Sequence, residues 1–117
     1  MSAILEKIND CLDKDKANNV INIDLKEKSS IADFMIIADG NSSRHISSMA
    51  NKLLENFKKN KHKVLSLEGL NNSDWILIDI GDIIIHLFKK DAREYYNLEK
   101  MWVDKGLAET FVIGSES

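Results

Sequence analysis

The sequence of 117 residues contains no proline and a single cysteine. Without proline, the chain has no residue that fixes a rigid hinge, and one thiol cannot form a disulfide within the chain. Cys11 lies among Ile4, Ile8 and Leu12 at helical spacing. Free cysteines on such a face usually behave as small apolar side chains, so we expect a buried structural thiol.

An excess of positive charge and a long apolar run are also missing. The formal net charge is −3, which excludes the broadly basic surface with which many proteins bind phosphates. No stretch approaches the roughly 18 apolar residues of a membrane span. The first ten residues lack the basic and apolar regions of a secretory signal. We therefore expect a cytoplasmic protein that does not contact membranes.

Apolar residues at helical spacing predict three helices. The first dozen residues form a short amphipathic pattern. The strongest pattern follows Asn41, Ser42 and Ser43, whose short polar side chains suit a helix N-cap. Asp91 and Glu94 resemble a capping box for a final helix, and its apolar side carries Tyr95, Leu98, Met101 and Trp102.

Five further segments have the patterns of strands. Residues 20–25 alternate apolar and polar side chains, as in an edge strand, whereas residues 34–38 are apolar on both faces, as in a central strand. Residues 64–68 alternate again, and the strand, helix, strand succession favours a parallel crossover. Gly81 and Asp82 separate residues 75–80 from 83–88, which predicts a tight antiparallel hairpin.

Together these elements predict an α/β (α+β) domain, a mixed five-stranded sheet with flanking helices in the order α-β-β-α-β-β-β-α. The 44% hydrophobic content is enough for one core. No regular spacing of apolar residues continues after about residue 103, so we expect a single domain over residues 1–103 and a C-terminal tail over 104–117.

The residues that could carry enzyme chemistry also have purely structural interpretations. The histidines His45, His62 and His86 lie in different elements without metal-ligand spacing, so we expect neither a metal nor a cofactor. The segment 39–43 could cradle a phosphate at a helix start, but without a longer glycine pattern a turn at Gly40 and a serine cap are the better interpretation. No serine lies in a glycine-flanked nucleophile motif.

A nucleotidyl transferase would need two carboxylates on one strand face to hold divalent cations. Asp79 is followed at that spacing by Gly81, so the second carboxylate is missing, and Asp82 is better interpreted as a turn residue. Trp75, His86, Tyr95, Tyr96 and Trp102 gather in the last hairpin and last helix. Aromatic residues near acids are typical anchors of protein interfaces, but each of these aromatics could equally be part of the core.

At these residues the sequence resembles the ribosomal silencing factor family, also called the RsfS or Iojap family, up to about Val103. In SSIADFMIIADGNSSRHISSMANKL the matching positions are Ser30, Asp33, Phe34, Ser42, Arg44 and His45. In WILIDIGDIIIHLFKKDAREYYNLEKMW they are Trp75, Asp79, Gly81, Asp82, His86, Phe88, Arg93, Tyr96, Leu98, Glu99 and Trp102.

The resemblance implies a nucleotidyltransferase-like fold without the catalytic carboxylate pair, and hence a protein that is not an enzyme. It implies binding to large-subunit protein fourteen and a steric block of subunit joining, which represses translation. The implied partner-binding residues are Trp75, Asp79, Asp82, His86, Arg93, Tyr96, Glu99 and Trp102. The alternatives are a large-subunit assembly factor, as in organellar relatives, or a nucleotidyltransferase-like enzyme. The edge strand at residues 20–25 is also compatible with a homodimer.

Overall fold

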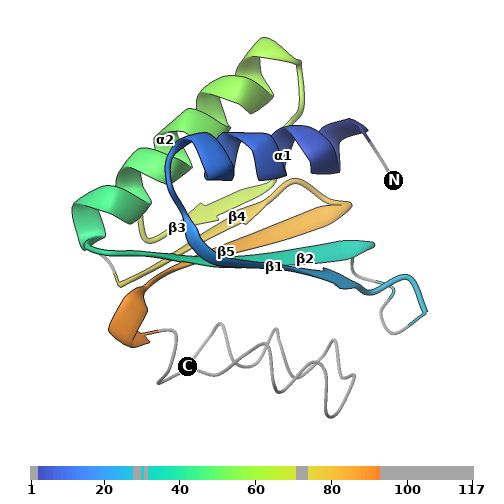
Figure 1. The fold of residues 1–117 in the computed structure, drawn as a ribbon. Helices are drawn as coiled ribbons and strands as arrows, with labels where there is room; N and C mark the ends of the chain where they lie inside the picture. Colours follow the sequence, from blue (N-terminus) through green and yellow to red (C-terminus); the bar gives the residue numbers. More distant parts are fainter. Residues whose placement is uncertain (1–2, 28–29, 31, 71–73, 93–117) are drawn as a thin grey trace.

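The computed structural model describes residues 3–27, 30, 32–70 and 74–92 (Figure 1). Its elements are α1 (Ala3–Lys14), β1 (Asn18–Asp24), β2 (Phe34–Gly40), α2 (Ser43–Lys59), β3 (Ser66–Glu68), β4 (Trp75–Asp79) and β5 (Ile83–Lys89). Residues 90–92 are helical, but the remainder of the predicted last helix and the tail at 104–117 lie outside the described residues. Neither α1 nor α2 is long and apolar enough to cross a membrane.

The strands form one mixed sheet in the order β1-β2-β5-β4-β3, which confirms the predicted architecture. β1 is an edge strand and β2 an interior strand, as their patterns predict. β2 and β5 run parallel, whereas the other neighbouring pairs are antiparallel. It follows that β2 and β3 are parallel to each other but are separated by two strands, so α2 connects strands that are not neighbours.

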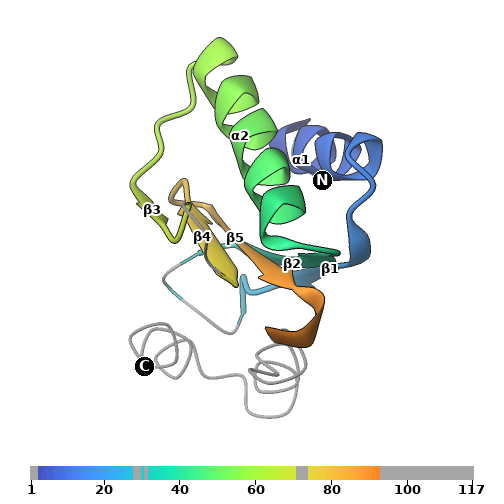
Figure 2. The ribbon, with the colours of Figure 1, turned by 90° about the vertical axis from the view of Figure 1, so that its left-hand side faces the viewer.

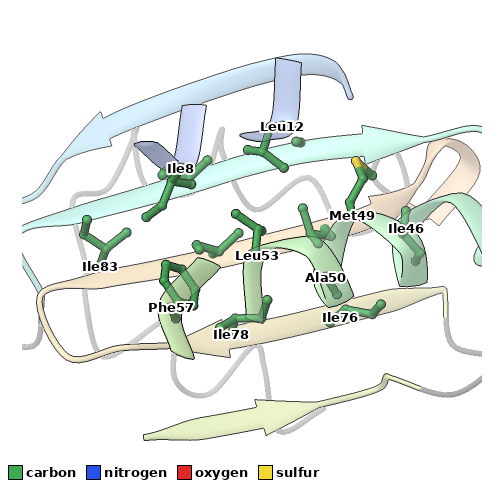
Figure 3. Packing of buried hydrophobic residues seen from close by; sticks show 14 of the residues in the cluster. Ile8, Leu12, Ile46, Met49, Ala50, Leu53, Phe57, Ile76, Ile78 and Ile83 are labelled. Atoms are coloured by element: carbon green, nitrogen blue, oxygen red, sulfur yellow. The ribbon is translucent and has the colours of Figure 1, made fainter. Parts of the chain in front are cut away.

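α1 and α2 pack on the same face of the sheet (Figures 1 and 2). The core beneath them joins Ile8 and Leu12 of α1 to Leu53 and Phe57 of α2, and these side chains meet sheet residues such as Ile78 (Figure 3). Burial of large apolar side chains of this kind contributes roughly 1.5–3 kcal/mol each. Cys11 packs at the margin of this core, and burial together with the nearby Asp15 carboxylate raises the pKa of its thiol. Cys11 is half-buried rather than fully buried, so the expected burial of its thiol is met only in part.

The opposite face of the sheet, here called the second face, is also apolar. Strand registers place alternate residues on it, among them Ile23, Met35, Ile37, Leu77, Ile84 and Phe88, and all of these are buried. Trp75 and Ala92 pack against this group. Two apolar faces explain why residues 34–38 show no alternation in the sequence.

The hairpin between β4 and β5 has the predicted tight turn. The Ile80 N–H donates to the Ile83 carbonyl oxygen at 3.1 Å, which leaves Gly81 and Asp82 as the loop. Gly81 has a φ of +98°, a region that side-chain-bearing residues rarely adopt. Glycine at the first loop position is thus a requirement of the backbone.

Candidate functional site

The junction between β2 and α2 uses its polar groups internally. The Ser42 side chain caps α2 by accepting from the His45 N–H at 3.1 Å, as predicted. The Asn41 N–H donates to His45 Nδ1 at 3.0 Å, and His45 Nε2 lies 2.8 Å from the Asp15 carbonyl oxygen. The N–H groups of Asn41 and His45 therefore already have acceptors and are not available to a phosphate.

Gly40 is needed for close packing rather than for a turn. It is the last residue of β2, and a Cβ atom there would lie 2.8–2.9 Å from Ile46 Cγ2, His45 Nδ1 and Met49 Cε. The glycine lets the end of β2 pass directly under the first turn of α2. The turn interpretation of Gly40 is therefore wrong, whereas the serine cap is confirmed.

The acids of the hairpin have structural roles in the turn. Asp79 Oδ1 accepts from the Gly81 N–H at 2.8 Å. The Asp82 carbonyl oxygen accepts from the N–H groups of Asp33 and Phe34, at 2.8 and 3.1 Å, while the residue as a whole is exposed. Within the described ranges, no group of three or more His, Cys, Asp or Glu side chains is placed to hold a metal ion.

Trp75, His86 and Phe88 form an aromatic stack on the second face. The Trp75 indole N–H donates to His86 Nδ1 at 2.7 Å. The Trp75 ring lies 5.3 Å from the Phe88 ring, and the His86 ring lies 5.9 Å from it, centroid to centroid. The indole is held from two sides, yet Trp75 remains half-buried rather than fully buried. Trp75 is therefore a rigid side chain with part of its surface accessible.

His86 is 0% exposed, so it cannot touch a partner in this conformation. Burial lowers its pKa to about 3, and the imidazole is neutral at physiological pH. Since Nδ1 accepts from Trp75, the ring proton is on Nε2. His86 could be an interface residue or part of the core. Its position fits the core role, in which it orients Trp75.

The register places Trp75, Asp79 and His86 on the same second face, while Asp82 is at the end of the hairpin. A hollow of about 180 Å³ adjoins Trp75 and is lined by Glu68, Gly69 and Leu77 as well. We call Trp75, Asp79 and Asp82 the hairpin patch. The other predicted contact residues, Arg93, Tyr96, Glu99 and Trp102, lie outside the described residues.

Sequence reasoning missed two exposed leucines. The alternation over residues 64–68 predicts the strand β3, but Leu65 is 57% exposed and Leu67 38% exposed. Leu67 pairs with Ile78 of the helix-covered core, so it lies on the helix face at the outer margin of the sheet. The position of β3 in the strand order, which periodicity does not give, decides that exposure.

Comparison with known proteins identifies the family. Residues 1–116 match the family model described as "Ribosomal silencing factor during starvation". The chain is 50% identical to the ribosomal silencing factor RsfS of Zymomonas mobilis over 99 residues, or 85% of this chain and 74% of that protein. It is 28% identical to the mouse protein "Mitochondrial assembly of ribosomal large subunit protein 1", covering 90% of this chain and 53% of that protein.

The fold is shared with a solved relative as well. A crystal structure of a Chromobacterium violaceum protein superposes with a TM-score of 0.81 at 28% identity, covering 85% of this chain and 82% of that chain. The match to the family model extends over nearly the whole sequence, including the hairpin patch and the capped start of α2. This chain belongs to the family of ribosomal silencing factors.

Proposed function

We propose that the chain is a cytoplasmic, non-enzymatic factor that binds the large ribosomal subunit and prevents the small subunit from joining it. Large-subunit protein fourteen is the proposed contact, and translation is repressed because the joined ribosome cannot form. No bond is made or broken in this mechanism, so the protein needs a stable docking surface rather than a reactive group.

The observation that carries the proposal is the hairpin patch. Trp75 is half-buried and fixed by His86 and Phe88, so little side-chain freedom is lost when a partner covers it. Tryptophan is among the residues that contribute most to binding when they fill a pocket at an interface. The carboxylates of Asp79 and Asp82 lie at the turn end of the hairpin, whereas Trp75 lies at its open end, paired with Phe88. An aromatic anchor and acids carried by one hairpin fit a basic protein surface.

Asp82→Lys is expected to weaken binding to purified large subunits about tenfold or more while leaving the fold intact. Asp82 is exposed, and its structural hydrogen bonds are made by its backbone oxygen, which lysine retains. Replacing an acid with a base opposite basic groups turns attraction into repulsion. Co-sedimentation measures the dissociation constant, and circular dichroism confirms the fold.

Asp13→Lys on α1 is the matched control, because it makes the same change of charge at an exposed position away from the hairpin. We expect this variant to bind like the wild type. Equal binding by Asp82→Lys and wild type would contradict an acidic docking patch.

A second function, assistance in large-subunit assembly, is favoured by the name of the mouse relative. The same docking surface could serve both roles, since each begins with binding to the large subunit. Sucrose-gradient profiles of cells lacking the protein distinguish them. Accumulated precursor particles indicate an assembly role, whereas normal particles with unregulated subunit joining indicate silencing.

A further inference from the structure

The margin of the sheet at β3 exposes apolar side chains that α2 does not cover. Leu65 and Leu67 are the two large apolar residues found exposed in the part of the chain that the structure describes. They flank Ser66, and their alternation puts both on the helix face of the sheet. We call them the leucine strip. Two neighbouring exposed leucines are more informative than scattered ones, because contiguous apolar surface in a soluble protein often marks an interaction site.

The position of β3 in the sheet leaves the leucine strip at an edge. β3 is the last strand in the order β1-β2-β5-β4-β3, and no described strand pairs with its outer side. α2 contacts β2, β4 and β5, so it packs over the middle of the sheet. β3 is only three residues long, which limits pairing at its backbone edge, so the exposed leucine side chains are the feature that a partner could cover.

The leucine strip adjoins the turn end of the hairpin patch. The Leu65 N–H donates to the Asp79 carbonyl oxygen at 2.7 Å, and Leu65 Cδ1 lies 3.4 Å from the place where a Cβ on Gly81 would be. Glu68, at the other end of β3, is exposed and lines the hollow beside Trp75. The exposed acids next to the strip are Asp82 at the turn and Glu68 on β3, whose side chain is on the second face, and Lys63 is the exposed base nearest along the chain.

We propose that the leucine strip is the apolar part of the docking surface and that it packs against apolar side chains of a basic protein of the large subunit. This inference rests on the proposed function and extends it from the hairpin to the margin of β3. The bordering carboxylates favour lysine and arginine at the rim of the partner, and they disfavour the phosphates of RNA. The hollow beside Trp75 offers the same partner a second apolar contact on the other face of β3.

The test compares the Leu65→Ser/Leu67→Ser double variant with wild type in co-sedimentation with purified large subunits. If the partner buries both leucines in the complex, replacing them with serine is expected to weaken binding by about tenfold to several hundredfold. Both side chains are exposed in the free protein, so thermal stability should change little. The matched control, Asn51→Ser/Glu55→Ser, changes two exposed residues of α2 and should bind like wild type.

If the wild type does not bind large subunits, the proposed function itself fails. If the wild type binds and the double leucine variant binds equally well, this inference alone fails. A photo-crosslinking amino acid, benzoylphenylalanine, at position 67 identifies the occupant. Crosslinking to a basic ribosomal protein supports the inference, whereas crosslinking to ribosomal RNA, to a second copy of this chain, or to nothing overturns it.

Discussion

Gly40→Ala is expected to destabilise the domain by about 1–3 kcal/mol, the range found when an extra methyl group is forced into a packed core. The added Cβ would lie within 3 Å of Ile46, His45 and Met49. The Met49 methyl group can move aside, but Ile46 is fully buried, and His45 Nδ1 accepts the Asn41 N–H. The new methyl group must therefore displace either the core or the first turn of α2.

Thermal unfolding measures this loss, which should appear as a decrease in Tm of several degrees, since a domain of this size shifts by about 4 °C per kcal/mol. The Gly40→Ala/Ile46→Ala pair supplies the control. Removal of Ile46 Cγ2 relieves one of the three close contacts, so the cost of Gly40→Ala should be smaller in the Ile46→Ala background. An unchanged Tm for Gly40→Ala would show that the end of β2 is not held against α2.

Acidification is expected to destabilise the wild type more steeply than a His86→Phe variant. Burial lowers the pKa of His86 to about 3, whereas an unfolded chain restores the ordinary value near 6.5. The unfolded state therefore binds the proton first. The stability contributed by neutral His86 is fully present above about pH 6.5 and falls by about 1.4 kcal/mol per pH unit until the pH reaches about 3.

Urea unfolding of both proteins at intervals between pH 7 and pH 4.5 measures this difference. The expected additional loss for the wild type over that range is about 3 kcal/mol. Carboxylates elsewhere titrate in both proteins and cancel in the comparison. His86→Phe starts from lower stability because the Trp75 N–H loses its acceptor, so the slope against pH, and not the absolute value, is the readout. Parallel curves would contradict a buried neutral histidine.

The sequence predicts those parts of the fold that depend on local chemistry. Gly81 and Asp82 define the hairpin because the first loop residue needs a positive φ, and Ser42 defines the start of α2 because its hydroxyl satisfies the His45 N–H. The edge position of β1 follows from its alternating pattern. The sheet order itself, with β5 inserted between β2 and β4, depends on long-range pairing that periodicity does not report.

The candidate site likewise combines features that the sequence predicts with features that only the assembled fold determines. Trp75 and Asp82 could be selected from the sequence because aromatic and acidic residues gather there. Whether His86 contacts a partner or Trp75 depends on the register between β4 and β5, which brings Trp75 Nε1 to His86 Nδ1. The exposure of Leu65 and Leu67 depends on how far α2 extends across the sheet. Both are properties of the assembled fold.

The central proposal is tested most directly by mixing the protein with purified large subunits and then adding small subunits. Sucrose-gradient sedimentation separates the subunits from joined ribosomes. We expect the protein to sediment with large subunits and the fraction of joined ribosomes to fall as the protein is titrated to stoichiometry. Asp82→Lys should restore joining at the same concentration. Binding that leaves joining undiminished, or no binding at all, would contradict silencing by occlusion.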